Sequence, residues 1–215
     1  MKNDAQLKSD VEAELRWDPS VHQEHIGVSV KDGVVELDGH VDSYYEKWAA
    51  ERAALRVSNV KALASEIQVE LPSSAARTDE DIARTARDHL DWNYSVPETV
   101  KVKVTDGWVT LSGTVDWQYQ RDEAEKAVRP LMGVHGVFDE ITVVPKPSAI
   151  DVKVAIEAAL KRSAETDAKH IEVGTSDGKV TLRGTVSSWA ERAEAERAAW
   201  AAPGVTSVVD LITVV

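Results

Sequence analysis

Residues that could do chemistry are present in this chain, but they do not form a familiar catalytic pattern. The six histidines do not recur at matching places, and none forms an i, i+4 metal-binding pair with a nearby carboxylate. His22 and His25 flank a predicted loop, and we interpret all six histidines as surface residues. The chain lacks cysteine, a phosphate-binding glycine-rich loop, a serine nucleophile elbow and a zinc-protease helix motif. We therefore expect no catalysis, no metal and no cofactor.

Carboxylates are abundant, but their spacing predicts solvated helix faces. Most are interleaved with Arg and Lys, as in residues 191–197, where each charge pair within a helix contributes only about a few tenths of a kcal/mol. Lys and Arg number 25 against 37 Asp and Glu, which gives a net charge of −12. That sign repels nucleic-acid phosphate and anionic lipid head groups at long range, so we expect no nucleic-acid partner.

Tryptophan is the residue type that points most directly to a binding surface. The chain has seven Trp and one Phe, and Trp favours positions with one apolar and one wet side. We interpret most of the Trp residues as caps at the rim of a small core. The ones that follow or lie near predicted helices are Trp17, Trp48, Trp92, Trp117, Trp189 and Trp200.

Trp108 lies instead in a predicted strand. Alternation places Val109 inward and Trp108 outward, and it also places Lys101 and Lys103 of the preceding strand outward. We expect Lys101, Lys103 and Trp108 to form a contact surface, either for a neighbouring module or for a phospholipid interface. Docking of a neighbouring module is favoured, because a wide apolar patch would otherwise be exposed.

The elements that must position these residues are set by an internal repeat. Three segments align without gaps: DGVVELDGHV from Asp32, DGWVTLSGTV from Asp106 and DGKVTLRGTV from Asp177. Six of the ten positions are identical in all three segments, and the spacings of 74 and 71 residues are long enough for a small domain each. An Asp-Gly pair between two alternating apolar runs predicts a tight hairpin, because Gly accepts a positive φ.

The pattern around each hairpin predicts the rest of a module. Apolar residues at i, i+4 and i+8 predict a first helix upstream, with Thr78 and Ser148 as candidate N-caps. Second helices are predicted over residues 44–58, 118–129 and 188–202, with left-handed C-caps at Asn59, Gly133 and Gly204. A last alternating run predicts a third strand, whose apolar residues in the second copy are Phe138, Ile141 and Val143.

The expected fold class is therefore α+β: three tandem α-β-β-α-β modules, each a three-stranded sheet with two helices on one face. The modules span 1–71 (module one), 77–145 (module two) and 148–215 (module three), with proline-containing linkers between them. Six glycines have structural roles, three in the hairpin turns and three on the inward face, where a missing side chain lets a helix approach. These are Gly33, Gly107 and Gly178, then Gly39, Gly113 and Gly184.

With that element order and the D-G-x-V-x-L-x-G-x-V core, the chain resembles the BON family, named for bacterial osmotically inducible and nodulation proteins. The resemblance implies a non-enzymatic module found in exported or envelope proteins, one that binds phospholipid surfaces and protects cells during osmotic and envelope stress. The chain departs from periplasmic members in showing no apolar export segment after Met1 and in carrying three modules where two are common.

We therefore expect a non-catalytic, stress-associated binding protein that contacts phospholipid or an envelope component through module surfaces. A cytoplasmic scaffold or chaperone-like protein, with its modules packed on one another, is the alternative. No apolar stretch approaches the roughly 18–20 residues that cross a bilayer, so any membrane contact is peripheral. A soluble, cytoplasmic chain is expected from the sequence, and a periplasmic one from the family.

Overall fold

Helices and strands repeat in the same order three times in the computed structural model, which describes residues 3–144, 151–162 and 171–215. Module one consists of α1 (Asp4–Trp17), β1 (Ile26–Lys31), β2 (Val34–Val41), α2 (Tyr44–Arg56) and β3 (Ala62–Val69). Module two consists of α3 (Asp79–Trp92), β4 (Lys101–Thr105), β5 (Trp108–Val115), α4 (Gln118–Val128) and β6 (Gly136–Val143). Module three consists of α5 (Val152–Arg162), β7 (Ile171–Ser176), β8 (Lys179–Val186), α6 (Trp189–Trp200) and β9 (Ser207–Val214).

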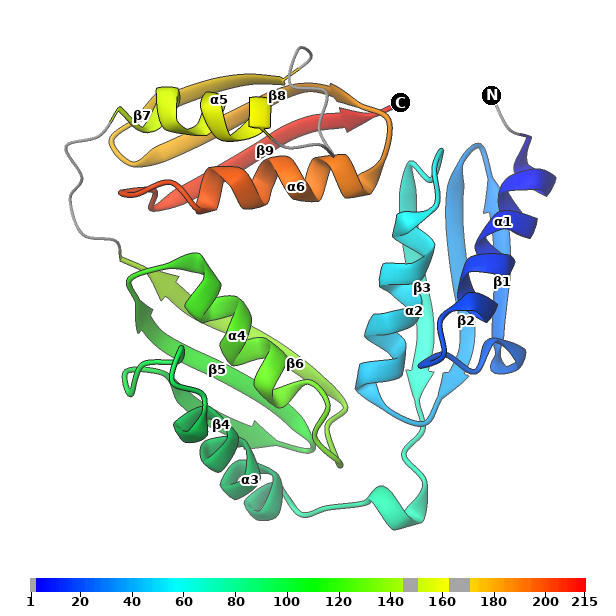
Figure 1. The fold of residues 1–215 in the computed structure, drawn as a ribbon. Coiled ribbons are helices and arrows are strands. Elements are labelled where there is room, and N and C mark those ends of the chain that lie inside the picture. Colours follow the sequence, from blue (N-terminus) through cyan, green and yellow to red (C-terminus); the bar gives the residue numbers. More distant parts are fainter. Residues whose placement is uncertain (1–2, 145–150, 163–170) are drawn as a thin grey trace.

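Each module is a two-layer unit with its own sheet. The first two strands form an antiparallel hairpin and the third strand pairs in parallel with the second, so β2, β5 and β8 are the central strands. Both helices of a module cover the same face of its sheet (Figure 1). The α+β fold class and the three-module organisation are confirmed. In the part of the chain that is described, no helix has both the length and the apolar character needed to span a bilayer.

The hairpin turns follow the expected chemistry. Asp32 and Gly33 both have positive φ, of 53° and 83°, and the other two Asp-Gly pairs match them. The first helix also holds the turn: the carboxylate of Asp4 accepts hydrogen bonds from the amides of Asp32 (2.8 Å) and Gly33 (3.2 Å). Asp79 makes the same pair of bonds in module two. These bonds hold the start of α1 against the hairpin turn of module one, and the start of α3 against the hairpin turn of module two.

The inward glycines have a different role from the expected one. Gly39 and Gly113 have φ values of 114° and 125°. A Cβ on Gly39 would overlap the carbonyl oxygen of His25, and one on Gly113 would overlap that of Thr99. The close neighbour is thus the backbone just before the adjacent strand, and the expectation of a helix approaching these glycines was wrong.

One of the predicted helix caps is confirmed. The Thr78 side chain accepts a hydrogen bond from the Asp81 amide at the start of α3, whereas Ser148 lies outside the described residues. The second helices end earlier than expected. Asn59, Gly133 and Gly204 have the predicted positive φ, but they lie in the turn before the third strand and not at the helix cap.

Three separate apolar cores lie between the helices and the sheets, one in each module. A few aromatic residues connect them. Tyr44 of module one packs against the core of module two, Trp189 of module three packs against the core of module one, and Trp200 of module three packs against that of module two. The cores of modules one and two therefore each have an aromatic side chain from another module at their edge.

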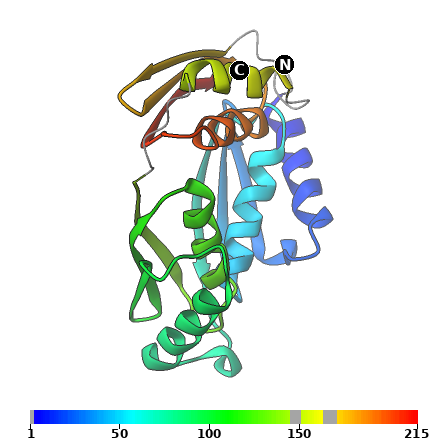
Figure 2. The same ribbon diagram turned by 60° about the vertical axis from the view of Figure 1, so that its left-hand side comes forward.

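The three modules are arranged around their second helices. In Figures 1 and 2, α2, α4 and α6 are turned toward one another while the sheets lie on the outside. α2 and α6 are in contact, so the first and last modules lie side by side. The chain thus closes on itself, and the sheet faces not covered by helices point away from the centre.

Candidate functional site

The predicted contact surface lies on the uncovered face of the module-two sheet. Lys101 and Lys103 are exposed on β4, and Trp108 begins β5 with 43% of its surface exposed. Strand pairing sets Lys103 opposite Thr110 and Lys101 opposite Ser112, one strand away from the aromatic residue. The structure therefore brings the two ammonium groups and the indole to one sheet face, on the opposite side from α3 and α4.

Phe138 extends this surface, although its sequence pattern grouped it with inward residues. It lies on β6, 53% exposed, and its ring stacks on Trp108 with centroids 5.0 Å apart. Gly136, which pairs with Trp108, has no side chain under the indole, and a Cβ there would overlap the ring. The parallel pairing of β6 with β5 places Phe138 opposite Thr110 and so on the outer face. We call Lys101, Lys103, Trp108 and Phe138 the outer patch.

The corresponding faces of the other modules differ in chemistry. Module one presents Val34, Glu36 and Asp38 on its central strand, and module three presents Lys179, Thr181 and Arg183. The positions equivalent to Phe138 are Ala64 and Val209. Among the described residues, only module two combines an aromatic pair with lysines on this face.

The tryptophans of the second helices lie where modules meet. The guanidinium of Arg129, from module two, lies 3.8 Å from the ring centroid of Trp48 in module one, within the range of an attractive cation–π contact. Burial raises the pKa of the neighbouring Tyr44. The interpretation of most tryptophans as core caps was wrong for Trp17 and Trp92, which are each 82% exposed.

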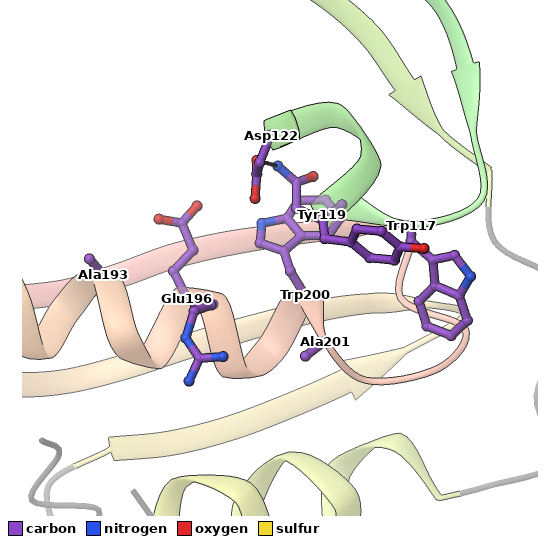
Figure 3. Close-up of a pocket in the computed structure, with 9 residues that line it drawn as sticks. Trp117, Tyr119, Asp122, Ala193, Glu196, Trp200 and Ala201 are labelled. Carbon is purple, nitrogen blue, oxygen red and sulfur yellow. Dashed lines mark hydrogen bonds between the residues drawn. The ribbon is translucent and has the colours of Figure 1, made fainter. Parts of the chain in front are cut away.

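A cleft of about 710 Å³ opens between modules two and three (Figure 3). The α4 wall carries Trp117, Gln118, Tyr119 and Asp122, and the α6 wall carries Ala193, Glu196, Arg197, Trp200 and Ala201. The sequence could not have indicated this cleft, because its two walls belong to different modules. The tryptophans in the two second helices were the available signal, but their spacing does not say that they share a cavity.

The polar groups of this cleft include two carboxylates and one buried amide oxygen, all of which are hydrogen-bond acceptors. Gln118 Nε2 donates to a carboxylate oxygen of Asp122 at 2.9 Å, while Gln118 Oε1 is buried without a donor among the described residues. Partial desolvation raises the pKa of Asp122, although its side chain is exposed, and the hydrogen bond from Gln118 opposes this shift. Arg197 donates twice to Glu194, at 2.7 and 2.5 Å.

A second polar cluster lies in module one, at the start of α2. The carboxylate of Glu46, which is 4% exposed, accepts a hydrogen bond from the His22 amide and lies 2.9 Å from His22 Nδ1. This contact raises the pKa of His22. His25 stacks on His40 with centroids 4.9 Å apart. No group of three or more potential metal ligands occurs among the described residues, and Glu46 serves to join the His22 loop to the helix.

Comparison with known proteins shows a relative that is induced under osmotic stress, as its name states. Osmotically-inducible protein Y of Escherichia coli (strain K12) is 38% identical over 117 residues, which are 51% of this chain and 58% of that protein. The chain thus aligns with a little over half the length of this relative. Two solved structures are more distant: CdsD, a structural protein of the type III secretion system of Chlamydia trachomatis, and the PrgH periplasmic domain.

CdsD is 15% identical, with 98% of this chain and 92% of that chain covered and a TM-score of 0.27. PrgH is 12% identical, with 89% and 95% covered and a TM-score of 0.23. The family profile described as BON domain, by contrast, matches residues 3–70, 78–145 and 151–215. Because this match recurs in each module and covers nearly the whole chain, the protein belongs to the BON domain family and carries three copies of the domain.

Proposed function

We propose that this protein is a non-catalytic, stress-associated binding protein that contacts anionic phospholipid through the outer patch of module two. The observation that carries the proposal is the exposed Trp108–Phe138 stack next to Lys101 and Lys103. Membership of the BON family and similarity to an osmotically-inducible protein support the stress association.

The outer patch has the chemistry of a peripheral membrane contact. Aromatic rings with one apolar and one wet side favour the level of the lipid head groups, and the ammonium groups on β4 can bind lipid phosphate. The net charge of −12 opposes approach from a distance. Attraction must therefore come from the local lysines, and binding should weaken as salt screens them.

Binding can be measured by co-sedimentation with vesicles of phosphatidylcholine and phosphatidylglycerol in a 7:3 ratio, with pure phosphatidylcholine vesicles as the reference. We expect wild-type protein to sediment with the anionic vesicles at low salt and to show a blue-shifted tryptophan emission. The Trp108→Ala/Phe138→Ala variant should lose both signals, because it removes the rings that enter the interface.

Two further variants make the test specific. Trp92→Ala is the matched control, since Trp92 is an exposed tryptophan of the same module outside the outer patch; its binding should equal that of the wild type. Lys101→Gln/Lys103→Gln should retain the aromatic stack and lose the preference for anionic vesicles. Equal sedimentation of wild type and Trp108→Ala/Phe138→Ala would reject the outer patch as the lipid contact.

A scaffold or chaperone-like role is a second candidate, favoured by the contacts among the second helices. Here the uncovered sheet faces would hold a protein partner, and the acidic surface would keep it in solution. Suppression of the thermal aggregation of an unrelated client, without vesicle binding, would favour this role. Fractionation of cells would distinguish a cytoplasmic from a periplasmic site of action.

A further inference from the structure

The cleft between α4 and α6 has three aromatic residues on its walls. Trp117 and Tyr119 come from the start of α4 and Trp200 from the end of α6. Figure 3 shows their rings following one another along the cleft. Its volume of about 710 Å³ lies within the range of small-molecule sites, roughly 300–1,000 Å³. Aromatic faces attract cations through the negative charge of their π-systems.

The charged groups of the cleft also favour a positively charged ligand. Asp122 lies on the α4 wall, and Glu196 extends from α6 toward it (Figure 3). Among the described residues, none forms an ion pair with Glu196. Arg197, the one cationic side chain among the described lining residues, is paired with Glu194. A cation in the cleft would therefore meet two carboxylates, while an anion would be repelled by them.

The hydrogen-bonding pattern indicates that the cation carries N–H groups. The two carboxylates are acceptors only, and a turn of the Gln118 amide would let its buried Oε1 accept a third bond. A quaternary ammonium ion could use the aromatic rings but would leave these acceptors without donors. Primary and secondary ammonium groups can contact the aromatic rings and also donate hydrogen bonds to these acceptors.

We propose that the cleft between modules two and three binds small linear amines, with ammonium groups held by Asp122 and Glu196 and the apolar chain held against Trp200 and Tyr119. This site is independent of the proposed lipid contact, because α4 covers the opposite face of the module-two sheet from Trp108. Partial desolvation raises the pKa of Asp122, whose side chain is otherwise exposed, and a bound cation would offset this desolvation.

Spermidine is the probe, and isothermal titration calorimetry with the full chain is the measurement. We expect Asp122→Asn and Glu196→Gln each to weaken spermidine binding about fivefold, as the loss of an accessible ion pair predicts. Tyr119→Leu should weaken it by a similar factor through loss of a ring. In a ¹⁵N-labelled protein, the side-chain amide signals of Gln118 should shift on binding and not in Asp122→Asn.

Controls separate this site from general attraction of a polycation to an acidic protein. Asp88→Asn removes one exposed carboxylate from the outside of α3 in the same module and should leave binding unchanged. Tetramethylammonium should not compete with spermidine. The proposal is overturned if Asp88→Asn weakens binding as much as Asp122→Asn, if tetramethylammonium competes equally, or if the wild type gives no binding heat and no Gln118 shift. The result of the vesicle experiment does not depend on this test, because none of the residues changed here lies in the outer patch.

Discussion

Replacement of Gly113 by Ala should destabilise module two selectively. Gly113 has a φ of 125°, and its Cβ would overlap the carbonyl oxygen of Thr99 and lie 3.0 Å from its carbonyl carbon. The backbone conformation costs a non-glycine residue about 1–3 kcal/mol, and forcing an extra methyl group into a packed site costs about 1–3 kcal/mol more. The expected loss of about 4 kcal/mol is close to the whole stability of a small domain, about 5 kcal/mol at the lower end of the range.

Gly174→Ala in module three is the matched control. Its nearest non-neighbouring atom would lie 3.8 Å from the new Cβ, and its φ lies outside the positive range, so we expect a change of at most about 1 kcal/mol. Hydrogen exchange followed by mass spectrometry reports the modules separately. A loss of 4 kcal/mol corresponds to exchange in β4–β6 that is about 10³-fold faster. Similar protection of β5 in both variants would refute the assigned role of the Thr99 carbonyl.

Two other predictions concern polar contacts at the second helices. Glu46 raises the pKa of His22 above 6.5, so protonated His22 should stabilise module one below about pH 6.5, and this contribution should be lost as pH rises through the folded pKa. An NMR titration should show the raised value in wild type and a lower one in Glu46→Gln; equal values would contradict the contact. Arg129→Ala removes the cation over Trp48 and should loosen the contact of modules one and two by about 1 kcal/mol, seen as faster exchange in α2 and α4 with β2 unaffected. Unchanged exchange in both helices would contradict a stabilising role for the contact between Arg129 and Trp48.

The closed arrangement explains how one small module can present three different surfaces. The second helices are used to hold the modules together, and this leaves the outer sheet faces turned away from the centre (Figure 1). The residues on those faces differ among the copies: acidic residues on module one, the outer patch on module two and basic residues on module three. A repeat of one fold thus becomes a protein whose three faces differ in charge and aromatic content.

Local structure followed from the sequence, because it depends on neighbours along the chain. The positive φ of Asp32 and Gly33, the Thr78 cap and the outward direction of Trp108 all follow from turn preferences, side-chain oxygens near free amides, and strand alternation. The repeat then predicted the order of elements in every copy. This is why the fold class could be read without any knowledge of long-range contacts.

Features that join distant segments were decided only by the tertiary structure. The face on which Phe138 lies was set by the parallel pairing of β6 with β5, and the need for Gly113 by the backbone of Thr99 just before β4. The cleft exists because α4 and α6 come together across modules. The first two features depend on contacts that form only when module two folds, and the cleft depends on contacts that form only when two modules pack. The spacing of residues along the chain does not encode which of these segments will meet.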